Sequence, residues 1–407
     1  MKKRYCGVII AMLVVLSVLT LSACGGGGSS SSGGGSAPAD TGSADGSAET
    51  TDAAGKAGIH IEPLTDDGSG AILNLADAKG PNGEEPAGVE DILNLISDEK
   101  AEEIRSAGYT AAISLHTVGT DWSVLQLEGM HDVLDEFNIK VIAETDAEME
   151  VEKQVSDLES IIGMKPDLLI SFVLDGDAVG PVLKEARAQG IQVSLIDSVP
   201  AGFTPGTDYA GMGTADNYAN GAASAQKLAD YLGGEGEIAM LNYVSSLFHT
   251  DARTQGARDV FAQYPDITIV AEDKVNSAET AATATEAMLT AHPDIAGIWT
   301  FWDVPGMGAV GVIESMGKDT KVVSVDLSED TAYSIASGGA MLASGAQHPY
   351  DQGVAEAMIG VAALAEIEPP SYVLVPGEIV TKESMSKSWE RVFRSPLPDD
   401  MKAILEE

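Results

Sequence analysis

The chain has 407 residues, which is long enough for two domains of ordinary size, and a formal net charge of −40. A surface this acidic repels nucleic acid and anionic lipid headgroups, so we exclude nucleic-acid-binding functions. The chain has only two cysteines, Cys6 and Cys24, and its six histidines show no metal-ligand spacing. Because both cysteines precede the part expected to fold, we predict no disulfide, no metal site and no cofactor in that part.

The first 24 residues have the pattern of an export signal. A basic start at residues 2–4 is followed by an apolar run over residues 8–21. The four letters LSAC, residues 21–24, resemble the bacterial lipoprotein cleavage box, and this resemblance implies that Cys24 becomes a lipidated N-terminus. We therefore expect an exported protein that is lipid-anchored on the outer face of the cytoplasmic membrane, which is the periplasmic side if an outer membrane exists. An uncleaved signal anchor is the alternative.

Two further segments precede the main body of the chain. Residues 25–58 consist largely of Gly, Ser, Ala, Thr and Asp with almost nothing to bury, so we predict a flexible tether. Residues 59–107 form an N-terminal extension with one predicted element, a helix over residues 98–107. Ser97 can cap this helix, and Asp98 and Glu99 suit its positive end.

From Thr110 onward, short apolar runs alternate with amphipathic stretches. The predicted strands are residues 110–115, 140–145, 167–171, 192–196, 237–241, 267–272, 295–300, 321–325 and 341–345. The predicted helices are residues 123–137, 147–162, 178–189, 217–232, 251–263, 278–291, 305–316 and 349–364. This alternation is typical of parallel sheets with helices on both faces, so the predicted fold class is α/β.

The strand and helix units fall into two series of similar size, before and after residues 209–217, which indicates two lobes with a cleft between them. In open α/β sheets, ligands bind beyond the carboxyl ends of the strands. Polar and aromatic residues recur at these ends, namely at residues 116–122, 172–177, 197–198, 242–251, 302–303, 326 and 347.

Two motifs suggest other chemistry, and their context argues against it. GMGAVG, residues 306–311, has the spacing of a dinucleotide-binding loop, but its first glycine does not follow the preceding strand directly, because Trp302-Asp303-Val304-Pro305 intervene. Because Asp303 and Pro305 are typical of a helix start, we place these glycines inside a helix and expect no nucleotide cofactor. Asp175-Gly176-Asp177 lacks the later carboxylates of a calcium loop, so we predict that Asp177 caps a helix.

The run AMLTAHPDIAGIWTFWDVPGMGAVGVIESMGKDTKVVSVDLS, residues 287–328, resembles the second lobe of the type I periplasmic sugar-binding proteins, which deliver ligands to ABC importers. The likeness extends over residues 108–385 and includes the segments GIQVSLID, TDARTQGARDVF and SGAQHPYDQG. It implies two doubly wound parallel-sheet lobes joined by a three-segment hinge near residues 215, 347 and 378. The first lobe would comprise residues 108–215 and 348–377, and the second residues 216–347 and 378–395.

The resemblance also implies a set of ligand contacts in the cleft. Trp122 takes the place of an aromatic ring that stacks on the sugar, and Asp197 that of a carboxylate at the end of the fourth strand. Arg253 matches the arginine of an R-x-x-G motif, Asp326 the aspartate at the end of a later strand, and Gln347 a hinge glutamine. Carboxylate and guanidinium groups suit such a site because each can bind two neighbouring hydroxyls.

Three positions depart from the family pattern. Ser198 stands in place of an arginine, and Phe172 and Trp302 stand in place of asparagines. We include Phe172 and Trp302 among the predicted ligand-binding residues and expect Trp302 to lie at the cleft mouth or hinge, on a ligand less polar than a pentose. The alternative is that Trp302 only fills the hinge. Trp299 and Phe301 are predicted to lie in the core.

The resulting hypothesis is a solute-binding lipoprotein that captures a small sugar, polyol or related solute and presents it to an ABC permease, without enzymatic activity. One rival is an aromatic-cage receptor for a nucleoside or a cationic solute, formed by Trp122, Phe172 and Trp302. Another is an exported enzyme with Asp197 or Asp326 as general base and His116 or His249 as its partner. A sensor that hands its liganded form to a membrane receptor is a further possibility.

Overall fold

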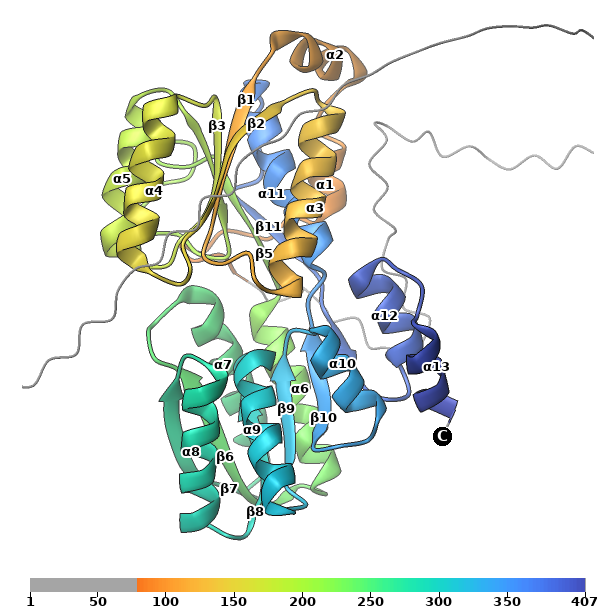
Figure 1. The fold of residues 1–407 in the computed structure, drawn as a ribbon. Helices are drawn as coiled ribbons and strands as arrows, with labels where there is room; N and C mark the ends of the chain where they lie inside the picture. The colour runs from red at the N-terminus through yellow and green to blue at the C-terminus, as the bar shows by residue number, and fades with distance from the viewer. Residues whose placement is uncertain (1–78, 407) are drawn as a thin grey trace, which may run out of the picture. The chain divides into compact units, whose positions relative to one another are not determined.

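The computed structural model describes residues 79–406, and these residues contain two six-stranded sheets (Figure 1). The first sheet has the order β11-β5-β4-β3-β1-β2, and all its neighbouring strands are parallel. The second has the order β12-β10-β9-β8-β6-β7, in which only the edge strand β12 is antiparallel. The strands are β1 (Thr110–Leu115), β2 (Lys140–Asp146), β3 (Leu168–Phe172), β4 (Gln192–Ile196), β5 (Gly211–Ala215), β6 (Glu235–Tyr243), β7 (Asp266–Val275), β8 (Ile295–Thr300), β9 (Lys321–Val325), β10 (Met341–Ala346), β11 (Tyr372–Val375) and β12 (Glu378–Val380).

Helices cover both faces of each sheet, and each sheet with its helices forms one lobe. In the first lobe α3 and α11 pack on one face and α4 and α5 on the other; in the second, α6 and α7 lie on one face and α8 and α9 on the other (Figure 1). The helices are α1 (Val89–Leu93), α2 (Asp98–Ala107), α3 (Asp121–Glu136), α4 (Val151–Met164), α5 (Gly176–Ala188), α6 (Asn217–Tyr231), α7 (Phe248–Phe261), α8 (Ala278–Ala291), α9 (Asp303–Met316), α10 (Glu329–Ala336), α11 (Pro349–Leu364), α12 (Met385–Phe393) and α13 (Asp399–Glu406). The predicted α/β class is confirmed.

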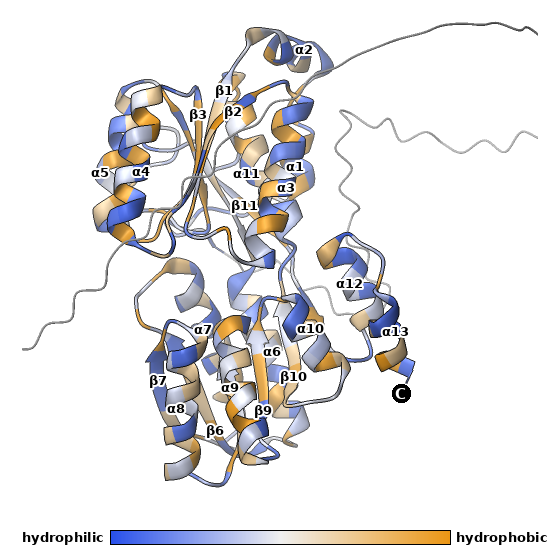
Figure 2. Cartoon of the chain, in the orientation of Figure 1, coloured by the Kyte–Doolittle hydropathy of each residue, from blue (hydrophilic) through white to orange (hydrophobic). Residues whose placement is uncertain are grey.

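The inner strands of both sheets are buried in the core, whereas the edge strands β2 and β7 are partly exposed. Figure 2 shows the strands mainly in the colours of hydrophobic residues, whereas the helices carry many hydrophilic ones. Trp299, within β8, and Phe301, just after it, are fully buried, which confirms that both belong to the core. Trp299 also donates a hydrogen bond from Nε1 to Ser224 Oγ, 3.0 Å away on α6, so its one polar atom is satisfied.

Strand β5 was not predicted, because its sequence GMGTA lacks a continuous apolar run. Its glycines are explained by the helix behind the sheet: a Cβ at Gly213 would lie 2.5 Å from Cγ of Glu356 on α11. A Cβ at Gly211 would lie 2.6 Å from the carbonyl oxygen of Pro370. The strand therefore depends on a close tertiary contact that local pattern does not reveal.

Five helices, α3, α4, α5, α7 and α9, start two to four residues away from the predicted position. Helix α4 begins at Val151 rather than at residue 147, because Glu148 and Met149 have left-handed backbones with φ of 53° and 62°. The prediction that Asp177 caps α5 is wrong. The cap is Asp175, whose Oδ1 accepts hydrogen bonds from the backbone N of Asp177 at 3.0 Å and of Ala178 at 2.9 Å. Ser97 caps α2 as predicted and accepts a hydrogen bond from the backbone N of Lys100.

The chain passes between the lobes three times: after β5 at Asp216, after β10 at Gln347, and between β11 and β12 at Gly377. The predicted three-segment hinge is therefore present. The third crossing requires a glycine, because a Cβ at Gly377 would lie 2.7 Å from the carbonyl oxygen of Ala346 and would also clash with the side chain of Asn220.

The predicted signal, Cys24 and the tether lie outside the described residues. Within residues 79–406, no helix has both the length and the apolar character needed to cross a membrane.

Candidate functional site

Two aspartates occupy equivalent positions at the carboxyl ends of the two sheets. Asp197 follows β4 and Asp326 follows β9, and each donates its backbone N–H across to the neighbouring strand, to Gly213 O and to Gly345 O, both at 3.0 Å. Both have left-handed backbones, with φ of 58° for Asp197 and 71° for Asp326. This conformation costs an aspartate more than a glycine, and backbone strain of this kind is often found at functional sites.

Arg253 on α7 links this position to the rest of the second lobe. Its side chain is buried, with an exposed fraction of 2%. Its Nε donates to Asn217 Oδ1 at 2.7 Å, and its Nη1 donates to the carbonyl oxygen of Phe301 and to Asp326 Oδ2, each at 3.1 Å. A buried guanidinium with several charge-assisted hydrogen bonds is held in one orientation, which suits it to recognise neighbouring hydroxyls.

Gln347 extends this network into the second hinge crossing. Its Nε2 donates to Asp326 Oδ1, and its Oε1 accepts a hydrogen bond from Gln352 Nε2 at 3.0 Å. Asp326 therefore bonds Arg253 through one carboxylate oxygen and Gln347 through the other.

Asp197 joins the network from the first lobe. Its Oδ1 accepts a hydrogen bond from Thr214 Oγ1 at 2.6 Å, and Thr214 Oγ1 accepts one from Asn217 Nδ2 at 3.0 Å. Burial raises the pKa of Asp197 to about 6, against the effects of the Thr214 bond and of Arg253. Asp197, Arg253, Asp326 and Gln347, four residues predicted from the sequence, thus lie in one hydrogen-bonded network that spans both lobes. It is called the polar network below.

Asp303, which the sequence prediction did not include in the site, lies beside the polar network. It is buried at the start of α9, and its Oδ2 accepts a hydrogen bond from the backbone N of Ser328 at 2.8 Å. Burial, together with the nearby charge of Asp326, raises the pKa of Asp303 to about 6.

Trp122 and Phe172 lie in a separate aromatic cluster. His116, directly after β1, stacks on Phe172 with a ring-centroid distance of 4.1 Å and meets Trp122 edge-on at 5.4 Å. His249, from α7 of the second lobe, contacts Phe172 at 5.7 Å, and its Nδ1 lies 3.2 Å from Ser198 Oγ of the first lobe. His116, Trp122, Phe172 and His249 are called the aromatic wall below.

Both histidines of the aromatic wall are uncharged at neutral pH. Burial lowers the pKa of His116 to about 4. The pKa of His249 is lowered well below its usual range, first by burial and then by the positive charge of Arg253. Neither histidine was in the predicted ligand set, although both lie at strand ends that the sequence had marked. Within residues 79–406, neither forms a hydrogen bond or ion pair with Asp197 or Asp326, the arrangement that the enzyme hypothesis requires.

Trp302 packs within the second lobe. It immediately precedes α9, and its ring is 4.4 Å from that of Phe301 and 5.2 Å from that of Tyr243, centroid to centroid. The side chain is half-buried against the second-lobe core, so one part of the indole remains accessible.

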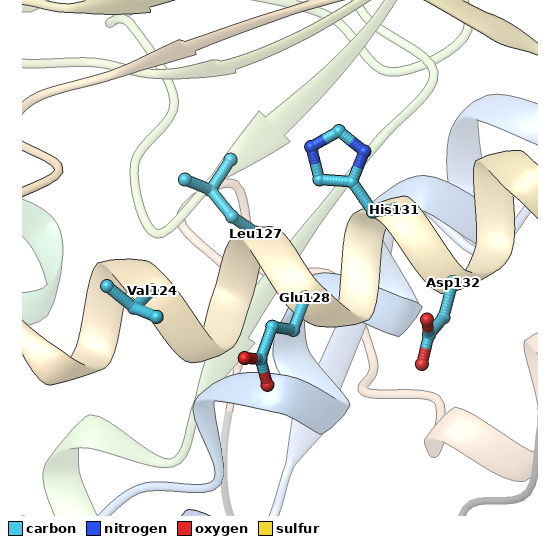
Figure 3. A pocket seen from close by; sticks show the side chains of 5 residues that line it. All are labelled: Val124, Leu127, Glu128, His131 and Asp132. Carbon is cyan, nitrogen blue, oxygen red and sulfur yellow. The ribbon is translucent and has the colours of Figure 1, made fainter. Parts of the chain in front are cut away.

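Two hollows lie on the surface. One, of about 430 Å³, is lined by the α3 side chains Val124, Leu127, Glu128, His131 and Asp132 (Figure 3). The other lies in the second lobe around Asn242, Thr250, Arg258, Glu272 and Lys274. Neither includes a predicted ligand-binding residue. Within residues 79–406, no three His, Cys, Asp or Glu side chains are grouped so that they could hold a metal ion.

Residues 111–367 match the family model of the periplasmic binding protein domain. Among curated proteins, the chain is 30% identical to a xylitol-binding protein of Mycolicibacterium smegmatis over 214 residues, which cover 52% of this chain and 60% of that protein. It is 28% identical to a ribose import binding protein of Bacillus subtilis over 228 residues, which cover 56% of this chain and 72% of that protein. The match to the first of these relatives thus covers less than two thirds of its length.

Solved structures have the same architecture. A sugar ABC transporter subunit from Rhodobacter sphaeroides has a TM-score of 0.62 and 26% identity, with coverage of 68% of this chain and 98% of that chain. A periplasmic solute-binding protein of an ABC transporter from Actinobacillus succinogenes, with bound D-allose, has a TM-score of 0.62 and 26% identity, with coverage of 69% and 99%.

Proposed function

The chain belongs to the type I periplasmic sugar-binding proteins of ABC importers, and from this premise we propose that it captures a small sugar, polyol or related hydroxylated solute and delivers it to the permease of an ABC transporter. Relatives named for xylitol and ribose, and a similar structure with bound D-allose, support a polyhydroxylated ligand.

The observation that carries this proposal is the polar network. Arg253 and Asp326 from the second lobe bond each other directly, and Asp197 from the first lobe is linked to Arg253 through Thr214 and Asn217. A ligand with adjacent hydroxyls can replace some of these bonds, because a hydroxyl both donates to a carboxylate and accepts from a guanidinium. Contacts to both lobes favour the closed arrangement around the hinge, which is the form that a permease would recognise.

We further propose that Cys24 carries the lipid anchor and that residues 25–58 tether the binding lobes to the membrane surface. This part of the proposal rests on the cleavage-box sequence and the Gly- and Ser-rich composition, since both segments lie outside the described residues.

The proposal is tested by titrating the protein with a panel of pentoses, hexoses and polyols. Arg253→Ala and Asp326→Ala should each weaken binding of the best ligand by about 1.5–3 kcal/mol, the effect of losing charge-assisted hydrogen bonds. Calorimetry measures the affinity, and chromatography of the recovered ligand checks that the ligand has not been converted to a product.

Arg258→Ala is the matched control, because Arg258 lies on the same helix but pairs with Glu272 outside the polar network. It should leave the affinity unaltered. Equal affinity in wild type, Arg253→Ala and Asp326→Ala would contradict the assigned site, and conversion of the ligand to a product would favour the enzyme hypothesis.

A further inference from the structure

The aromatic wall lies at the same edge of the first sheet as Asp197. His116 follows β1, Phe172 ends β3 and Asp197 follows β4, and these three strands are adjacent in the order β4-β3-β1. Because the carboxyl ends of parallel strands meet at one edge, the wall and the polar network adjoin each other at the ligand-binding edge. His249 closes the wall from the second lobe through its contacts with Phe172 and Ser198.

Two polar atoms of the wall are buried without a partner in the described part of the chain. These atoms are Trp122 Nε1 and His116 Nδ1. Buried polar groups are normally hydrogen-bonded, and leaving one unsatisfied costs free energy. Both atoms are themselves buried, although other atoms of the two side chains remain partly exposed. The group that meets the wall should therefore offer hydrogen-bonding atoms as well as a surface for the rings.

The rings of the wall favour a flat partner. Stacked and edge-on aromatic contacts are strongest with another planar π-system. A purely hydrocarbon ring would stack but would leave Trp122 Nε1 and His116 Nδ1 unsatisfied, and a simple sugar or polyol would offer the rings C–H groups instead of a π-face. A planar heterocycle, which has both a π-face and ring nitrogen or carbonyl atoms, meets both requirements.

The charges around the wall favour an uncharged ligand. His116 and His249 are neutral at pH 7 because burial lowers the pKa of each. The charged groups that act on the two histidines are the carboxylate of Asp146 at His116 and the guanidinium of Arg253 at His249, and Arg253 is already paired with Asp326. A phosphate group would therefore meet more negative than positive charge.

We propose that the ligand is a neutral nucleoside, with its sugar hydroxyls on the polar network and its base on the aromatic wall. This inference rests on the proposed function, because it assigns the sugar part of the ligand to the site described above. It specifies what the wall adds: recognition of a nucleobase through stacking and through hydrogen bonds to Trp122 Nε1 and His116 Nδ1.

The test is calorimetric titration of the full-length protein in detergent with inosine, uridine, ribose, xylitol, choline and the two nucleoside 5′-monophosphates. At least one nucleoside should bind about tenfold or more tightly than ribose, and its monophosphate about tenfold or more weakly than the nucleoside. Trp122→Phe and His116→Phe keep a ring but remove the polar atom. Each should weaken nucleoside binding severalfold more than it weakens ribose binding.

Trp389→Phe is the matched control, because Trp389 lies in α12 and its Nε1 is bonded to Ser395 Oγ. It should not alter nucleoside affinity. If ribose or xylitol binds as tightly as both nucleosides, the nucleoside inference is overturned but the proposed function stands. The same holds if the protein binds sugars and binds choline tightly but neither nucleoside. Failure of every sugar, polyol and nucleoside to bind would overturn both.

Discussion

Asp197 and Asp326 show how single residues are specialised at this site. In each, a left-handed backbone turns the chain at the end of a strand and leaves the carboxylate in the polar network. Glycine would adopt this conformation more easily, but it has no carboxylate to offer. The strain, on the order of 1–3 kcal/mol for each residue, is consistent with a functional requirement that outweighs local stability.

Trp302 should contribute to both stability and ligand affinity. Its ring packs on Phe301 and Tyr243 and is half-buried. We expect Trp302→Ala to lower the free energy of unfolding by roughly 2 kcal/mol, less than for a fully buried aromatic, and to weaken ligand binding by roughly 1–3 kcal/mol if the accessible face stacks on the ligand. Denaturant unfolding and calorimetry measure the two effects separately.

Trp299→Phe is the control for this experiment, because Trp299 is fully buried and should affect stability alone. Unchanged affinity together with reduced stability in Trp302→Ala would show that Trp302 is a packing residue and remove it from the ligand set.

At the scale of elements, α12 connects the second lobe to the first. Its apolar face, with Met385, Trp389 and Val392, is buried in the second-lobe core. Arg391 pairs with the buried carboxylate of Glu378 on β12. Arg394, just beyond the helix, lies 3.9 Å over the ring of Tyr350 and 3.8 Å from Asp351, both at the start of α11 in the first lobe. The helix therefore braces the hinge crossings from outside.

The carboxyl of Asp351 makes this brace sensitive to pH. Burial raises its pKa to about 6, partly offset by Arg394. Between about pH 4 and pH 6 the Asp351 carboxyl keeps its proton in the native state, whereas in the unfolded state it has lost it. The contribution of this group to stability therefore falls as the pH rises from about 4 to about 6. Asp351→Asn removes this titration. The difference in free energy of unfolding between the variant and wild type should therefore shift in favour of the variant by on the order of 1–3 kcal/mol from pH 4 to pH 7.5.

Chemical unfolding of both proteins at the two pH values measures this difference. The comparison with wild type is necessary because His348, also at the hinge, has its pKa lowered to about 4 by burial. Its contribution therefore has the opposite sign and is lost as the pH falls from about 6.5 to 4. An effect of Asp351→Asn that is the same at both pH values would contradict the assigned pKa.

At the scale of the whole molecule, the two lobes repeat one design and meet at few polar contacts in the described residues. The Ser198–His249 contact is one, and the bond from the backbone N of Glu329 to Asp121 Oδ2 at 2.8 Å is another. In the first contact, His249 in the first turn of α7 meets the first lobe, and in the second, Glu329 in the first turn of α10 meets the first turn of α3. Contacts of this kind can break when the hinge opens, whereas the core of each lobe stays intact.

Membrane attachment is also a property of the whole chain. If Cys24 carries the lipid, Cys24→Ser should release the protein from the membrane without changing its ligand affinity. Fractionation of cells followed by titration of the released protein measures both. Cys6→Ser is the control and should remain membrane-bound, because Cys6 lies inside the expected signal. Retention of Cys24→Ser in the membrane fraction would favour an uncleaved anchor formed by residues 8–21.

The sequence alone determined the class of fold and the positions of most elements. Strands at 110–115, 192–196, 295–300 and 321–325 and helices at 278–291 and 349–364 were predicted with the bounds that the structure has. These elements are readable because their periodicity is local: apolar residues repeat along the segment itself. The polar candidates Asp197, Arg253, Asp326 and Gln347 could be marked because the segments around them resemble those of a known family.

Only the tertiary structure decided which of these residues meet and what else joins them. The glycines of β5 lie where Glu356 of α11 and the carbonyl oxygen of Pro370 approach the strand closely, and His249 from the second lobe completes the aromatic wall by contacting Phe172 and Ser198 in the first. Asp175 rather than Asp177 became the cap because of the backbone geometry at the start of α5. Such contacts depend on the packing of distant segments or on exact backbone angles, and neither leaves a periodic signal along the chain.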